Sequence, residues 1–302
     1  MTDVAERVRV LGTAFMEFAS PEPQALVGVL QGMGFRPVAR HRTNQAVLMR
    51  QATVDFIVTQ QPGSHGMGFA AQHGPSCAGM AFRVADSAQA MALARQRGAK
   101  PLDAPSLLPG CALQGIGGSA LYLVDDAALK ALYAQFDFSE DTTPEVAAPF
   151  VRVDHVTHCV HPGNMDQWVS FYKNIFGFQE VFKFVAGDAT NGFDTIAVRD
   201  PDSTACVTVV EPMGICHWLT SPHSPRIATM VRNGILQMRM SDSMFRQLPT
   251  PLDCISSTQR CPPAQAPATS ATPSSSVVSG MPRMVSEAST RWISLECPAS
   301  GT

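Results

Sequence analysis

The sequence has no segment rich in lysine and arginine, and its 302 residues carry a formal net charge of -3. A protein that follows a phosphate backbone needs a basic patch or stripe, so we expect no nucleic-acid partner. No apolar run reaches the roughly 18 residues that a membrane span requires. Charged residues also occupy the N-terminal stretch where a signal peptide has its apolar core. We therefore expect a cytoplasmic location and no membrane partner.

Two common site motifs are also missing. The eight cysteines are scattered without a C-x-x-C pair, which argues against a zinc site or a disulfide framework and indicates reduced thiols. The glycine-rich stretch at 62–76 is not followed by GK[ST], and no strand leads directly into it. We interpret this stretch as a loop or short helix rather than as a phosphate-binding loop.

What the sequence does contain is one pattern that recurs, most clearly in residues 153–184. Alternation through VDHVTH predicts a strand that carries His155. Aromatic and apolar residues then recur at helical spacing, which predicts a helix with Asn164 or Asp166 as its N-cap and Gly177 at its end. The residues QEVFKF predict a second strand directly after this helix.

Two earlier stretches follow the same order. Residues 13–59 predict a strand, a helix, a Gly-Phe turn and two more strands, the second of which is long enough to be broken by a turn near Gln51. The pattern then restarts with a strand, a helix begun by Asp86 or Ser87, and a strand at 117–125. A single unit cannot bury its sheet face alone, so pairs of units are predicted to fold together. The expected fold is α+β, with barrel-like curved sheets and helices outside.

The units predict four parts of the chain. We expect an N-terminal two-module domain at 10–130, a linker at 131–150, and the first module of a C-terminal domain at 151–212. The fourth unit is not recognisable, so residues 213–302 are expected to form a divergent, mostly disordered tail rich in proline, serine and threonine. The abrupt change suggests a reading-frame shift near 200–215, which translation of the other two frames would test.

Several motifs together resemble one known family. The chain resembles the 4-hydroxyphenylpyruvate dioxygenases, members of the vicinal oxygen chelate superfamily, over roughly residues 10–212. The motifs that carry this resemblance are MEFASPEP, GFRPVARHR at 34–42, AAQHGPSCAGMAFRV at 70–84, GGSALYLVD at 117–125, DHVTHCV and WVSFYKNIFGF. The resemblance implies repeated βαβββ modules in a glyoxalase-like fold, with the second domain incomplete in this chain.

The resemblance also implies a chemistry. Members of the family hold Fe(II) with two histidines and one glutamate, which leaves positions for a small aromatic 2-oxo acid and O2. They convert 4-hydroxyphenylpyruvate and O2 to homogentisate and CO2 in tyrosine and phenylalanine catabolism. The family commonly associates, so a homo-oligomer is a possible partner state.

Individual site residues follow from the same resemblance. His155 stands at the first iron ligand, whereas His158 matches a family residue that is not a ligand. His217, in GICHW, is the candidate for the second ligand, although it follows the Glu-Pro pair of the third module almost at once. No F-F-E or F-L-E string offers a third ligand. Thr195 keeps the hydroxyl of a substrate-binding position, and Val210 replaces a family asparagine.

With two of three ligands not found, we expect the chain as written to have little or no turnover. One alternative is a non-catalytic protein that binds a small aromatic or hydrophobic molecule in the barrel cavity of residues 10–130. Another is a dioxygenase of the 4-hydroxymandelate synthase type, which uses the same iron centre. An uncovered sheet face on the third module would also predict association.

Overall fold

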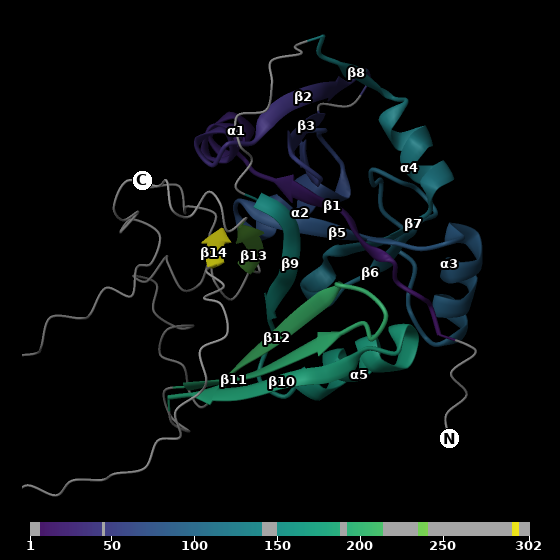
Figure 1. Cartoon of the computed structure of the whole chain (residues 1–302), viewed down its shortest axis with the longest axis vertical. Coiled ribbons are helices and arrows are strands. Elements are labelled where there is room, and N and C mark those ends of the chain that lie inside the picture. The colour runs from purple at the N-terminus through teal and green to yellow at the C-terminus, as the bar shows by residue number, and fades with distance from the viewer. Residues whose placement is uncertain are drawn as a thin grey trace, which may run out of the picture.

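The computed structural model describes residues 7–43, 46–140, 150–187 and 192–213, together with the backbone of 235–240 and 292–295. The strands form one sheet of eight strands and one of six (Figure 1). Within the described residues, no helix is long and apolar enough to cross a membrane.

The first module has the predicted strand and helix, followed by three strands because the long second predicted strand is broken at the expected turn. Its elements are β1 (Gly12–Ala19), α1 (Pro23–Gly32), β2 (Arg36–His41), β3 (Ala46–Gln51) and β4 (Val54–Thr59). The turn predicted near Gln51 is confirmed, because β3 and β4 form a hairpin in which Ala52 has a positive φ of 48°. β4 then returns to lie parallel to β1.

The second module follows a short helix at the glycine-rich stretch. Its elements are α2 (His65–His73), β5 (Ser76–Arg83), α3 (Ser87–Gln96), β6 (Ala112–Gln114), a 3-10 turn at Ile116–Gly118, β7 (Ala120–Val124), α4 (Asp126–Tyr133) and β8 (Phe136–Phe138). Asp86 caps α3 as predicted, with its carboxylate accepting the backbone N–H of Gln89 at 2.8 Å. β5 pairs antiparallel with β1, which joins the two modules at the middle of the sheet.

The predicted linker at 131–150 is wrong in its first part. β8 lies within it and pairs antiparallel with β2, so the N-terminal unit extends beyond residue 130 through Phe138. The reason is burial: Phe136 is 2% exposed, and its ring contacts His41 at a centroid distance of 4.9 Å. Residues 141–149 of the linker lie outside the described residues.

The third module repeats the first. Its elements are β9 (Phe150–Cys159), α5 (Met165–Phe176), β10 (Gln179–Ala186), β11 (Gly192–Arg199) and β12 (Cys206–Met213). The order β10-β11-β12-β9 in the smaller sheet matches β2-β3-β4-β1 in the larger one, whose other neighbours are β6-β7-β5 on one side and β8 on the other. Gly177 ends α5 with a φ of 70°, as predicted.

Two strands occur in the predicted tail. β13 (Ile235–Met240) pairs antiparallel with β9, in the place that β5 takes beside β1 (Figure 1). β14 (Trp292–Leu295) pairs antiparallel with β13, whereas β7 is parallel to β5, so the second sheet departs from the first beyond β13. The remainder of the predicted disordered tail lies outside the described residues.

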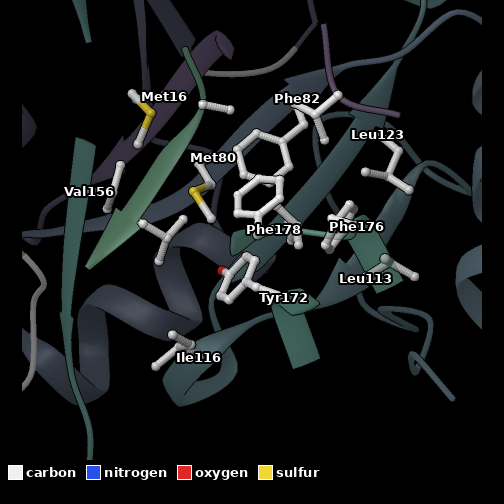
Figure 2. Close-up of a cluster of buried hydrophobic side chains, with 14 of the residues drawn as sticks. Met16, Met80, Phe82, Leu113, Ile116, Leu123, Val156, Tyr172, Phe176 and Phe178 are labelled. Atoms are coloured by element: carbon white, nitrogen blue, oxygen red, sulfur yellow. The ribbon is translucent and has the colours of Figure 1, made fainter. Parts of the chain in front are cut away.

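The two units share one hydrophobic core, in which residues of both sheets pack with the buried face of α5. Figure 2 shows Tyr172 and Phe176 of α5 together with Met80 and Phe82 of β5. The Phe82 ring of β5 meets Phe176 edge-on at a centroid distance of 5.6 Å. Arg7 adds a polar contact, because its guanidinium donates to the Phe176 carbonyl and to the buried Asp200 carboxylate. The core therefore holds β9 and α5 in a set position against the N-terminal unit.

Candidate functional site

β9 carries the two histidines of the VDHVTH motif on opposite faces. Successive side chains of a strand alternate, so His155 shares a face with Thr157, while His158 shares the other face with Val156. Val156 belongs to the core that contains the buried residues of α5. His155 therefore lies on the sheet face away from α5, and His158 lies on the α5 side.

The imidazole of His155 is held by its sequence neighbour. Its Nδ1–H donates to the Asp154 carboxylate at 2.9 Å, and Arg152 donates to the other carboxylate oxygen at 3.2 Å. Burial acts to raise the pKa of Asp154. The hydrogen bond and charge of His155 and the charge of Arg152 together outweigh this effect, so the pKa of Asp154 lies below its usual value. In metal-binding histidines, the N–H group of the other ring nitrogen often donates a hydrogen bond to a carboxylate in this way.

Strand register brings Thr195 and Val210 to the same face as His155. Thr195 pairs with Val210, and Val210 pairs with Cys159 of β9. Paired residues point to one face, so we call this surface the His155 face, defined by His155, Thr195, Val210 and Phe184. Thr195 is buried, whereas its partner Phe184 on β10 is 49% exposed. The role of Thr195 in substrate binding stays a prediction.

The strand that pairs with β9 at His155 is β13. Gln237 is the register partner of His155, and β13 reads ILQMRM, which contains no histidine, cysteine, aspartate or glutamate. By its position beside β9, this strand corresponds to the opening strand of a fourth module. His217 lies outside the described residues, so its role as the second ligand stays a prediction.

The residues that the structure describes do not fit the expected iron centre. A facial triad requires two histidines and a carboxylate within reach of one point. Across the described ranges, no group of three histidine, cysteine, aspartate or glutamate side chains could hold a metal ion. His155 and Asp154 provide one oriented imidazole and its supporting carboxylate, and we derive no catalytic step through a metal from them.

Comparison with known proteins agrees with this fold and motif. Residues 6–139 match the family described as hydroxyphenylpyruvate dioxygenase, HPPD, N-terminal. The chain is a relative of the 4-hydroxyphenylpyruvate dioxygenases. A dioxygenase of this name from Pseudomonas sp. strain P.J. 874 is 38% identical over 200 residues, which are 64% of this chain and 56% of the relative. The hemolysin VllY of Vibrio vulnificus is 36% identical over 67% of this chain and 59% of its own length.

The fold assignment extends to a solved structure of a related enzyme. A variant of 4-hydroxymandelate synthase from Streptomyces coelicolor superposes with a TM-score of 0.58 at 18% identity, covering 76% of this chain and 88% of that one. The expected vicinal oxygen chelate fold is thereby confirmed, with curved sheets that are not closed. The chain spans slightly more than half the length of the curated dioxygenase relatives that it matches.

A second feature, which the sequence pattern did not predict, draws its residues from several of these motifs and from the segments between them. A cavity of about 1130 Å³, which we call the interdomain cleft, lies between the N-terminal unit and α5. Its walls include His73 of α2, Lys100 after α3, Gly117 of the 3-10 turn, His158 of β9 and Trp168 of α5. These residues are distant in sequence, so no local pattern could have grouped them.

His158 lines the interdomain cleft and is half-buried. Its Nε2 atom is buried, and no hydrogen-bond partner for it occurs among the described residues. Burial lowers the pKa of His158 to about 4, so the imidazole is neutral near pH 7. The interpretation of His158 as a residue without a metal-ligand role is compatible with this position on the α5 side.

Proposed function

We propose that this chain derives from an Fe(II)-dependent 4-hydroxyphenylpyruvate dioxygenase and has little or no turnover of its own. The reaction of that lineage converts 4-hydroxyphenylpyruvate and O2 to homogentisate and CO2. The supporting observation is the register of β13: this strand pairs Gln237 with His155, and its sequence ILQMRM contains no histidine, cysteine, aspartate or glutamate.

The physical reason is the number of ligands. Fe(II) in oxygenases of this kind is held by three protein side chains, which must be deprotonated and correctly spaced. His155 is oriented by Asp154, but one imidazole competes poorly with water and buffer for a divalent ion. Val210, the register partner of Thr195, stands where the family has an asparagine, so the His155 face also lacks that amide.

The test is iron binding and turnover by the whole chain. Purified protein is dialysed anaerobically against Fe(II), and bound iron, O2 uptake and homogentisate are then measured with 4-hydroxyphenylpyruvate. We expect less than stoichiometric iron that is unchanged in His155→Ala, and no homogentisate. The Pseudomonas sp. relative serves as the active control. Stoichiometric iron that is lost in His155→Ala, together with homogentisate formation, would overturn the proposal.

The same assay separates the two alternatives. Formation of 4-hydroxymandelate in place of homogentisate would identify an enzyme of the 4-hydroxymandelate synthase type. The non-catalytic alternative located its ligand inside the N-terminal sheet. There, Phe15, Ile57 and Tyr122 are packed in a buried cluster with side chains of α4, so this face is filled. Any ligand-binding role is better supported at the interdomain cleft.

A further inference from the structure

We propose that the interdomain cleft binds a small aromatic carboxylate. At about 1130 Å³ it is large enough for a molecule of this size, because ligand pockets commonly measure roughly 300–1,000 Å³. The walls come from the N-terminal unit and from α5, which the shared core holds together. The ligand class follows from the charge, the aromatic surface and the polar atoms of these walls.

The charge of the cleft favours an anion. Arg97 and Lys100 line it, and the described lining residues include no aspartate or glutamate. Arg97 is held in place, because its guanidinium donates to the Asn174 carbonyl at 2.7 Å across the domain boundary. A guanidinium has five N–H donors, so others remain for a carboxylate. Glu211, which contacts the lining residue Asn164, is already the acceptor of two backbone N–H groups.

The aromatic side chains that line the cleft favour a ligand that contains an aromatic ring. Trp168 and Phe171 line the cleft from one turn of α5, and their rings meet edge-on at a centroid distance of 5.3 Å. Both side chains are only half-buried although both pack against the core. An aromatic ligand would cover this remaining surface, and ring pairs contribute beyond the apolar area that they bury.

His158 provides the polar contact that would orient the ligand. Buried polar atoms in folded proteins nearly always have a hydrogen-bond partner, and Nε2 of His158 has none among the residues described. A neutral imidazole can donate to a carboxylate or accept from a hydroxyl group. Because Nε2 is shielded from solvent in the structure, a bound molecule would complete the hydrogen bonding of this atom after the imidazole turns toward the cleft.

The site is independent of the proposed iron chemistry. His155 does not line the interdomain cleft and lies on the opposite face of β9. Replacement of His155 is therefore expected to leave the lining of the cleft unchanged. Binding here can succeed or fail whatever the result of the iron and turnover assay.

The first experiment measures binding to the whole chain by isothermal titration calorimetry. The probes are naphthoate and its neutral analogue naphthylmethanol. We expect naphthoate to bind at least about tenfold more tightly, because hydrogen bonds to charged groups contribute about 1.5–3 kcal/mol. No binding of naphthoate at millimolar concentration, or equal binding of the two probes, would overturn the proposal.

Variants locate the site. Lys100→Gln and Arg97→Gln should each weaken naphthoate binding about fivefold or more. The matched control is Arg95→Gln, an exposed arginine of α3 that does not line the cleft, and His155→Ala is the second control. Both controls should bind like the unmodified chain. If Arg97→Gln does not fold, Lys100→Gln alone serves as the test, because Lys100 is exposed. Unchanged naphthoate binding in Lys100→Gln would contradict the proposal.

A third variant tests the role of His158. His158→Leu keeps most of the side-chain volume and removes a polar atom that has no partner in the described chain. Its stability in urea should equal or exceed that of the unmodified chain, while naphthoate binding weakens about fivefold or more. Binding that stays unchanged in a stable His158→Leu protein would exclude His158 from the site.

Discussion

Glu17 is a buried acid at the centre of the N-terminal sheet. It lies on β1 and is 1% exposed. Its Oε2 atom accepts a hydrogen bond from the Tyr122 hydroxyl group at an O···O distance of 2.7 Å. Burial raises the pKa of Glu17 to about 7, although the hydrogen bond from Tyr122 acts to lower it. The first turn of α2 packs tightly on the carboxyl group, because a Cβ added at Gly66 would lie 2.8 Å from Glu17 Oε1.

Glu17→Gln should change how stability depends on pH. The folded pKa of Glu17 lies above the unfolded value of 4.5, so the folded state binds more protons between pH 4.5 and about 7. Stability is fully present below this window and falls by about 3 kcal/mol as pH rises through it. Glutamine stays neutral and still accepts from Tyr122, so the variant should lose this fall.

Urea unfolding at pH 5 and pH 8 measures the effect. The difference between the two pH values should be smaller by about 3 kcal/mol in Glu17→Gln than in the unmodified chain. Glu180→Gln is the control, because Glu180 is an exposed glutamate of β10. Equal pH dependence in Glu17→Gln and the unmodified chain would show that Glu17 is ionised in the folded state.

At the scale of elements, the N-terminus of α5 is capped by a residue from a strand that is distant in sequence. Asn164 and Asp166 were predicted as alternative caps, but Asn164 makes no side-chain cap hydrogen bond. The carboxylate of Glu211, at the end of β12, instead accepts the backbone N–H groups of Asn164 and Met165 at 2.8 and 2.9 Å. A negative charge at a helix N-terminus is also favoured by the helix dipole. This contact ties α5 to the sheet beside the interdomain cleft.

Glu211→Ala should therefore destabilise the fold by about 1–2 kcal/mol, because two N–H groups lose their acceptor. Glu211→Gln keeps an acceptor and should cost roughly half as much. Glu180→Ala serves as the matched control, since Glu180 contacts the exposed Lys173 at 2.8 Å and such pairs contribute about 0–1 kcal/mol. Urea denaturation of the three variants gives the comparison, and equal losses in Glu211→Ala and Glu180→Ala would refute the capping role.

At the scale of the whole molecule, one surface stands out. Of the eight exposed large hydrophobic residues in the described part of the chain, five lie on β10 and β11 of the smaller sheet: Val181, Phe182, Phe184, Val185 and Phe193. Phe182 and Phe184 stack with a centroid distance of 6.1 Å and lie on the His155 face. In the N-terminal unit, β8 pairs along the corresponding outer strand β2. Apolar surface of this kind favours association.

A Phe182→Ser, Phe184→Ser double variant should associate less than the unmodified chain. Light scattering after size-exclusion chromatography measures the weight-average mass over a range of protein concentrations. We expect the mass of the unmodified chain to rise with concentration and that of the variant to stay nearer to the monomer. Leu11→Ser, at an exposed apolar residue away from this surface, is the control. A concentration-independent monomer mass for the unmodified chain would contradict the expected association.

Sequence alone determined the features that depend on local spacing. The strand and helix that open each module, the end of α5 at Gly177 and the turn near Gln51 were predicted, because periodicity and glycine conformation act over a few residues. Motifs of similar length placed His155 on a strand and pointed to the dioxygenase relatives. These features depend on neighbouring residues and not on contacts with distant parts of the chain.

Only the tertiary structure decided which distant residues meet. The return of β8 to β2, the cap that Glu211 supplies to α5, and the pairing of Gln237 with His155 all join residues far apart in the chain. The interdomain cleft arises in the same way, from five separate segments. Such contacts depend on how buried faces pack against each other, and a sequence pattern records only that a face is apolar, not which partner covers it.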